Sequence, residues 1–164
     1  MHITQGPQFN GKASKRLHVM AKPIGAACNI DCTYCYYLSK QDLLEYKKGC
    51  TPVMDEETLE TYIRQYIEGQ NTPEIIFSWQ GGEPTMLGLD YFKKIVEFQS
   101  KYKPEGVVIS NDLQTNGTLL NDDWCAFLKA NNFLVGLSID GPEMMHNAYR
   151  TNRAGRGTFN QVMK

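Results

Sequence analysis

Four short apolar runs recur along the chain, and each is followed by a loop of small or polar residues. They cover residues 17–21, 75–79, 107–109 with its continuation to 115, and 134–139. Runs of this length, rich in β-branched and aromatic residues and bounded by Gly or Pro, are typical of strands. The pattern therefore predicts four strands.

A helical period lies between the first two runs. Apolar residues recur at positions i, i+3, i+4, i+7 and i+8, namely Leu59, Tyr62, Ile63, Tyr66 and Ile67. This spacing places them on one face of a helix. Asp55 is suited to cap the helix N-terminus, and Gly69 stands where a glycine commonly follows a helix C-terminus.

Three further segments show the same period. One covers about residues 90–102, the next begins with Asn121 as its cap, and the last begins near Thr158. The apolar positions expected to face inward are Phe92, Ile95 and Val96 in the first segment, and Trp124, Phe127 and Leu128 in the second. The chain is thus expected to alternate between strands and helices.

Alternation of this kind predicts an α/β fold with a parallel sheet. Right-handed crossovers would place the helices on one side of a curving sheet or on both sides of an open one, and the pattern does not choose between them. The residues of unusual type all follow the carboxyl ends of the expected strands. They are the cysteine loop, the Gly81-Gly82-Glu83-Pro84 turn, Thr115-Asn116-Gly117, and Ser138 with Asp140. In α/β sheets and barrels this edge is where ligands bind.

The composition fits a globular domain. The 164 residues are 41% hydrophobic and 21% charged, with a formal net charge of −1. These values exclude a disordered tail, a collagen-like repeat and a coiled coil, and near-zero charge argues against nucleic acid as the main partner. The sequence shows neither a secretory signal nor an apolar stretch that would span a membrane, so we expect a cytoplasmic protein without a membrane partner.

The length sets a limit on the fold. A complete eight-stranded (β/α) barrel needs about 250 residues, and four strands do not close one. We expect residues 1–16 to be a lead-in segment and residues 17–164 to be the N-terminal part of a longer core domain, containing about its first four βα units.

Three of the five cysteines lie close together. Cys28, Cys32 and Cys35 have the spacing C-x₃-C-x₂-C, whereas Cys50 and Cys125 stand apart. An odd number of cysteines with one tight cluster indicates a metal site in a reducing compartment rather than a disulfide framework. We expect Cys125 to be a small buried residue of a helix.

Thiolates are the ligands of iron–sulfur clusters, and three of them can hold a four-iron cluster with one iron left open. Structural zinc is the alternative and would need a fourth ligand. His18, His146 or Cys50 could supply it, although none has a local spacing that favours the assignment. From spacing alone both metals remain open.

The cysteine spacing, together with the Gly81-Gly82-Glu83-Pro84 segment after the second expected strand, resembles the radical S-adenosylmethionine (SAM) superfamily. This resemblance implies a parallel (β/α) partial barrel, a [4Fe–4S] cluster held by Cys28, Cys32 and Cys35, and S-adenosyl-L-methionine on the open iron. The residues that it implies as cofactor contacts are Tyr34, Gly81, Gly82, Glu83, Asn116, Ser138 and Arg150.

All of these residues except Glu83 also have a simpler interpretation. Tyr34 could shield the loop from solvent, and Asn116-Gly117 is a common turn. Ser138 could be a strand-end hydroxyl, and Arg150 a solvated charge. Two glycines usually mark a turn, although the backbone of Gly81 and Gly82 could also approach a ligand closely.

Longer segments resemble the anaerobic sulfatase-maturating enzymes. They are HVMAKPIGAACNIDCTYCYYL, FSWQGGEPTMLGLDYF, LQTNGTLLNDDWCAFL and FLVGLSIDGPEMMHNAYR. The resemblance implies an oxidoreductase that converts a Cys or Ser of a sulfatase polypeptide to Cα-formylglycine, with a flavodoxin- or ferredoxin-type electron donor. It implies Tyr37 and Gln80 as substrate contacts, although Tyr37 could simply pack and Gln80 could bond a turn.

The same family carries two auxiliary clusters in a C-terminal SPASM region, together with an Asp proposed as the catalytic base. Cys50 and Cys125 cannot build those clusters, so the base is expected beyond Lys164 and no catalytic residue within the chain. The chain alone should therefore not complete the oxidation. The alternatives are another SPASM-type peptide modifier, such as a thioether-forming enzyme, a non-catalytic zinc module, and a nucleic-acid binder supported only by Arg150, Arg153 and Arg156.

Overall fold

The four predicted strands form one parallel sheet. The computed structural model describes residues 11–13, 15–37 and 53–164. Its main sheet has the order β1-β3-β4-β5. The strands are β1 (Met20–Ala21), β3 (Glu74–Trp79), β4 (Val108–Thr115) and β5 (Phe133–Leu137). The parallel α/β prediction is therefore confirmed.

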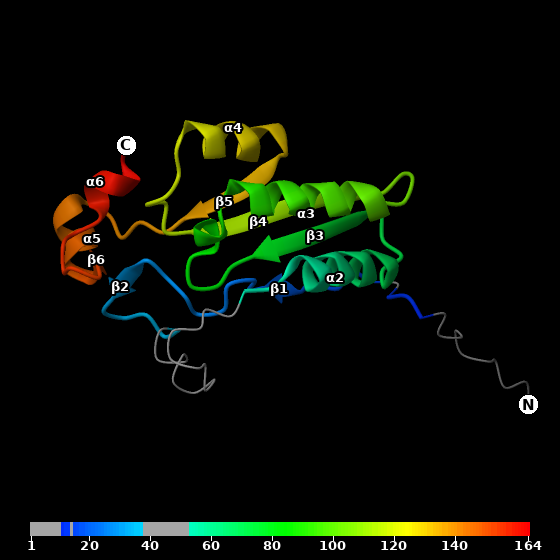
Figure 1. The fold of residues 1–164 in the computed structure, drawn as a ribbon, viewed down its shortest axis with the longest axis horizontal. Coiled ribbons are helices and arrows are strands. Elements are labelled where there is room, and N and C mark those ends of the chain that lie inside the picture. The colour runs from blue at the N-terminus through cyan, green and yellow to red at the C-terminus, as the bar shows by residue number, and fades with distance from the viewer. Residues whose placement is uncertain (1–10, 14, 38–52) are drawn as a thin grey trace, which may run out of the picture.

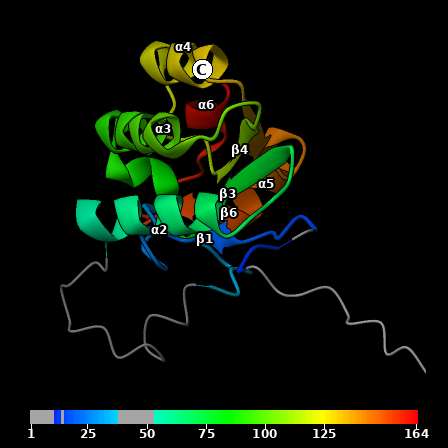
Figure 2. The same cartoon turned by 90° about the vertical axis from the view of Figure 1, so that its right-hand side faces the viewer.

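The principal helices lie along one face of this sheet (Figures 1 and 2). They are α2 (Glu56–Glu68), α3 (Leu89–Tyr102) and α4 (Asp122–Ala130), each in the crossover that the sequence pattern predicts. This arrangement resolves the choice left open by the sequence, because a single helical layer matches a curving sheet of the partial-barrel type. No helix in the described segments is long and apolar enough to cross a membrane.

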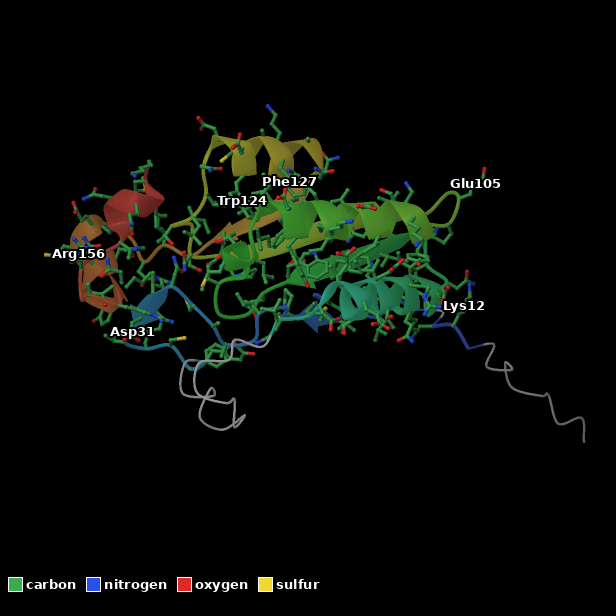
Figure 3. The ribbon with its side chains drawn as sticks, viewed as in Figure 1. Lys12, Asp31, Glu105, Trp124, Phe127 and Arg156 are labelled. Carbon is green, nitrogen blue, oxygen red and sulfur yellow. The ribbon has the colours of Figure 1, made fainter. Side chains whose placement is uncertain are left out.

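The core fills the space between the helices and the sheet. Ile75, Phe77 and Trp79 alternate along β3 and are buried, as expected when every second residue of a strand faces one layer. Trp124 and Phe127 lie on the side of α4 that faces the sheet (Figure 3), and the Trp124 ring meets that of Phe92 edge-on at 5.0 Å.

Two of the expected inward positions, Val96 and Phe127, are only half-buried. On α3, Phe98 and Gln99 are buried. Gln99 forms a reciprocal amide pair with Asn111 of β4, at 2.8 and 2.9 Å. The Asn111 Oδ1 also accepts a hydrogen bond from the Trp79 indole at 2.8 Å. Helix α3 is therefore fixed to the sheet by satisfied polar groups as well as by apolar packing.

The predicted helix ends are largely correct. The Asp55 Oδ1 accepts a hydrogen bond from the Thr58 backbone N–H at 2.8 Å, and the Asn121 Oδ1 accepts one from the Trp124 N–H at 3.0 Å. Gly69 ends α2, but its backbone is right-handed, with φ −73°, instead of the left-handed form typical of a glycine after a helix. It ends the helix without using glycine's conformational freedom.

A second, smaller unit lies at the carboxyl edge of the sheet (Figure 1). In it β2 (Ile30–Cys32) pairs antiparallel with β6 (Arg150–Asn152), and Cys32 stands opposite Arg150. Helices α5 (Glu143–Tyr149) and α6 (Phe159–Val162) flank β6. Only the start of α6 near Thr158 follows from the sequence pattern. A short 3₁₀ turn, η1 (Pro84–Leu87), precedes α3.

Within this smaller unit, His146 of α5 is linked through Thr158 to the backbone of β6. Its side chain is fully buried, and its Nε2 lies 3.0 Å from the Thr158 Oγ1. That hydroxyl donates to the Arg150 carbonyl at 3.0 Å, so Nε2 must carry the proton that it shares with Thr158. Nε2 carries this proton in both the neutral and the charged ring, and burial disfavours the charged form.

We expect Asn121→Ala to lower the free energy of unfolding by about 1 kcal/mol, because the first turn of α4 loses its capping acceptor. Asn121→Asp keeps an oxygen at the same place and should stay close to the parent. Urea unfolding followed by circular dichroism measures both. Equal losses in the two variants would show that the cap contributes nothing.

We also expect stability to fall between pH 7.5 and 5.5. Burial lowers the pKa of His146, so below the ordinary histidine pKa of about 6.5 the unfolded chain takes up a proton that the folded chain does not. His146→Gln should flatten this dependence. Free energies of unfolding at the two pH values test it, and an unchanged slope in the variant would contradict it.

Candidate functional site

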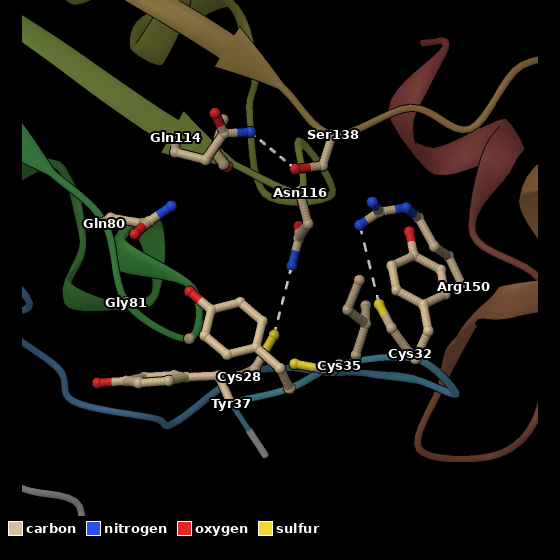
Figure 4. A pocket seen from close by; sticks show the side chains of 15 residues that line it. Cys28, Cys32, Cys35, Tyr37, Gln80, Gly81, Gln114, Asn116, Ser138 and Arg150 are labelled. Atoms are coloured by element: carbon tan, nitrogen blue, oxygen red, sulfur yellow. Dashed lines mark hydrogen bonds between the residues drawn. The ribbon is translucent and has the colours of Figure 1, made fainter. Parts of the chain in front are cut away.

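A pocket opens at the carboxyl ends of the parallel strands (Figure 4). It lies between the cysteine loop, the loop after β3, the end of β4 and the start of β6. Every residue expected at the site lines this pocket, with Glu83 as the exception. The structure also adds Gln114, whose Nε2 donates to the Ser138 Oγ at 2.9 Å and thereby links the ends of β4 and β5.

The cysteine triplet supplies three free thiols to the pocket. Cys28 is buried, and Cys32 and Cys35 are half-buried. Cys125 is exposed on α4, so the expectation of a buried residue is wrong. The buried residues of this helix are Trp124 and Leu128. Cys50 lies outside the described residues.

Burial controls the protonation of the thiols. It raises the pKa of Cys28, and it raises that of Cys32 to about 11, although the positive charge of Arg150 acts in the opposite direction. Metal ligation by these thiols therefore requires the release of protons.

The donor set fits an iron–sulfur cluster. Thiolates are its normal ligands, and a four-iron cube bonds each thiolate to a different iron, so the sulfur atoms need not converge on one point. Among the described residues, no group of three or more His, Cys, Asp or Glu side chains is arranged around a single ion.

The histidines considered as a fourth zinc ligand are engaged elsewhere. The His18 Nε2 lies 2.6 Å from the Ser78 Oγ, which donates to the Asp112 carboxylate on the sheet. His146 is bonded to Thr158, as described above.

The loop after β3 is stacked directly on the cysteine loop. The Gly82 N–H donates to the Gly25 carbonyl and the Glu83 N–H to the Ala27 carbonyl, both at 2.8 Å. A Cβ on Gly82 would lie 1.9 Å from the Ala27 oxygen, and one on Gly81 would lie 2.8 Å from the Gly25 oxygen. Glycine is required at these positions because two protein backbones meet there, whereas the sequence suggested either a turn or an approach to a ligand.

Glu83 lies behind the pocket. Its side chain is fully buried. One carboxylate oxygen accepts hydrogen bonds from the Thr85 N–H, the Thr85 hydroxyl and the Thr115 hydroxyl at 2.6–3.0 Å, and the other accepts from the Asn116 N–H at 2.7 Å. Glu83 thereby ties the loop after β3 to the end of β4.

Asn116 connects that strand end to the cysteine loop. Its Nδ2 donates to the Asn29 Oδ1 at 2.9 Å and to the Cys28 Sγ at 3.7 Å. Its Oδ1 accepts from the Thr118 N–H and hydroxyl, and Gly117 has φ +77°. The Asn-Gly pair is therefore a turn and also a contact to a cysteine.

Arg150 forms a two-bond ion pair with Asp140, at 2.9 Å from Nε and 3.0 Å from Nη2. The Tyr34 hydroxyl donates to the same carboxylate at 2.7 Å, and the guanidinium stands 5.5 Å from the Tyr34 ring centre. Burial acts to raise the pKa of Asp140, but the bonds from Arg150 and Tyr34 outweigh it and lower the pKa. Burial and the bond to Asp140 raise that of Tyr34 to about 12.

The sequence placed Asp140 at the ligand-binding edge but gave it no role. Its Asp-Gly-Pro context indicates a turn, and its partner is ten residues away. The second of the three arginines considered for a nucleic-acid surface, Arg153, donates to the Cys28 carbonyl at 2.8 Å. Arg150 and Arg153 therefore interact with residues of the cysteine loop. This leaves little support for a nucleic-acid surface.

Tyr37 and Gln80 lie together at one side of the pocket (Figure 4). The Lys22 Nζ stands 4.0 Å from the centre of the Tyr37 ring, a distance suited to a cation–π contact.

Comparison with known proteins gives consistent matches. The family model of the radical SAM superfamily matches residues 23–164. The chain is 50% identical over 151 residues to a serine-type anaerobic sulfatase-maturating enzyme of Bacteroides thetaiotaomicron, covering 92% of this chain and 36% of the relative. It is 42% identical over 146 residues to a cysteine-type enzyme of Clostridium perfringens, covering 89% and 39%.

A solved structure gives the same answer for the fold. It is described as native anSMEcpe with bound AdoMet and Kp18Cys peptide, and it matches with a TM-score of 0.76 and 40% identity over 87% of this chain and 37% of that one. The chain thus spans little more than a third of the length of these relatives. The matches favour the iron–sulfur interpretation over the zinc module.

We expect Gly82→Ala to reduce both stability and iron loading, because the new methyl group would separate the two stacked loops. Gly106→Ala is the control: nothing lies near its Cβ, and only its φ of +76° carries a cost, of roughly 1–2 kcal/mol. Iron content after anaerobic reconstitution and urea unfolding measure the effects. Equal behaviour of the two variants would contradict the contact assigned to Gly82.

Proposed function

The chain belongs to the radical SAM superfamily, and from this premise we propose that it forms the cluster- and SAM-binding part of an anaerobic sulfatase-maturating enzyme. Such an enzyme oxidises a Cys or Ser side chain of a sulfatase to Cα-formylglycine. The observation that carries the proposal is the set of three free thiols on one loop, which line a pocket together with the glycine loop after β3. Identities of 50% and 42% to serine-type and cysteine-type enzymes support it.

In this proposal Cys28, Cys32 and Cys35 hold a [4Fe–4S] cluster and leave one iron for S-adenosyl-L-methionine. When bound, the pair supplies a one-electron cleavage chemistry that yields a hydrogen-abstracting radical. The protein's own contribution is to exclude water and to position these groups, since the chemistry belongs to the cofactors. Burial of Cys28 and the aromatic cover from Tyr34 serve that purpose.

The pocket wall offers SAM several polar contacts. We assign to this role the backbone of Gly81 and Gly82, the Ser138 hydroxyl, and the faces of Tyr34 and Arg150 that are directed into the pocket. Glu83 and Asn116 act there by fixing the loop positions. Because Arg150 uses two N–H groups on Asp140 and one on the Cys32 Sγ, its two remaining N–H groups are the donors left for SAM.

We place the substrate peptide at the Tyr37 and Gln80 side of the pocket. An aromatic ring and an amide at the same side of a pocket suit an extended polypeptide, because the ring packs on its side chain while the amide bonds its backbone. The catalytic base and the auxiliary clusters of the family are expected beyond Lys164. We further propose a flavodoxin- or ferredoxin-type donor and a cytoplasmic site of action, where thiols remain reduced.

We expect anaerobic reconstitution with iron and sulfide to give a brown protein with visible charge-transfer absorbance and SAM-dependent changes in the spectrum of the reduced cluster. Cys28→Ser should abolish both, because a two-thiolate site cannot retain the cube. Cys125→Ser is the matched control, since this exposed thiol lies on α4, and it should behave as the parent. A colourless parent, or loss of colour in the control, would overturn the assignment.

A further inference from the structure

Two side-chain N–H groups are directed at the thiols of the triplet (Figure 4). The Asn116 Nδ2 lies 3.7 Å from the Cys28 Sγ, and the Arg150 Nη1 lies 3.8 Å from the Cys32 Sγ. Both distances suit hydrogen bonds to sulfur, which is a larger acceptor than oxygen. The Asn116 donor is a neutral amide, whereas the Arg150 donor is a guanidinium with a full positive charge.

Hydrogen bonds to the backbone and the side chain of Asn116 hold its amide donor in place. Its backbone N–H is bonded to the buried Glu83 carboxylate at 2.7 Å, so the strand end cannot shift. Its side-chain oxygen is held by Thr118, and its Nδ2 is shared with the Asn29 Oδ1. The amide therefore presents its N–H group to Cys28 in one orientation.

The Arg150 donor is fixed in the same manner by a different carboxylate. Asp140 binds Nε and Nη2, which leaves Nη1 at the corner of the guanidinium nearest to Cys32. The β2–β6 pairing places the Arg150 backbone opposite Cys32. The side chain is only 14% exposed, so its charge is weakly screened by solvent.

Hydrogen bonds and positive charge at cluster sulfurs favour the reduced state, because reduction adds negative charge to the cluster. We infer that Asn116 and Arg150 are positioning and tuning residues whose N–H···S bonds to Cys28 and Cys32 raise the reduction potential of the cluster, with Glu83 and Asp140 as the carboxylates that aim them. This inference rests on the proposed function, since it requires the cluster to be present.

The two donors should differ in strength. Loss of the Asn116 amide removes one dipole, whereas loss of the Arg150 guanidinium removes a charge and leaves the Asp140 carboxylate unbalanced near Cys32. The shift to lower potential should therefore be larger for Arg150 than for Asn116.

The test is a potentiometric titration of the reconstituted full chain, followed by electron paramagnetic resonance of the reduced cluster. Arg150→Gln should lower the midpoint potential most, Arg150→Lys less because the charge remains, and Asn116→Ala by a smaller amount than Arg150→Gln. Asn116→Ser serves as a second variant if the alanine form does not fold.

Arg153→Gln is the matched control. Arg153 is also an arginine that contacts the cysteine loop, but it is exposed and bonds the Cys28 carbonyl instead of the sulfur, so its loss should move the potential least. Loaded variants with the parent's potential, or an equal shift in the control, would overturn the inference and leave the proposed function intact. A parent that binds no cluster would instead overturn the proposed function.

Discussion

The contact between two backbones, at Gly82 and Ala27, is the constraint on which the site depends. It joins the loop after β3 to the cysteine loop with no side chain between them. Such close stacking restricts the movement of both loops. The thiols are therefore held in position relative to the parallel sheet. Rigid support is what a cofactor site needs, because small displacements of its ligands are costly.

The same arrangement of side chains occurs twice around this contact. A carboxylate outside the pocket lining holds a nitrogen donor that bonds a cysteine sulfur, as Glu83 does for Asn116 and Asp140 for Arg150. Glu83 is fully buried, and its negative charge is tolerated because donors surround both of its oxygens. The function of these carboxylates is to hold Asn116 and Arg150 in position. A residue with that function does not need to line the pocket, and Glu83 does not line it.

Local periodicity revealed most of the fold. The strands and the helices α2, α3 and α4 follow from apolar spacing and capping residues, because short-range physics decides them. The β2–β6 pair could not be found in this way: three residues within a cysteine motif carry no strand pattern, and their partners lie some 120 positions later. Asp140 was missed as the anchor of Arg150 for the same reason, since an ion pair leaves no periodic trace. The exposure of Cys125 was also missed, because its apolar neighbour Trp124 did not show which face of the helix Cys125 would occupy.

The pairing of β2 with β6 has a consequence for biogenesis. The cysteines leave the ribosome early, but the segment that clamps Cys32 is synthesised more than a hundred residues later. Until then the thiols stand on an unfinished loop, where a metal ion could bind with the wrong geometry. Productive insertion of a cluster should therefore follow the synthesis and pairing of β6.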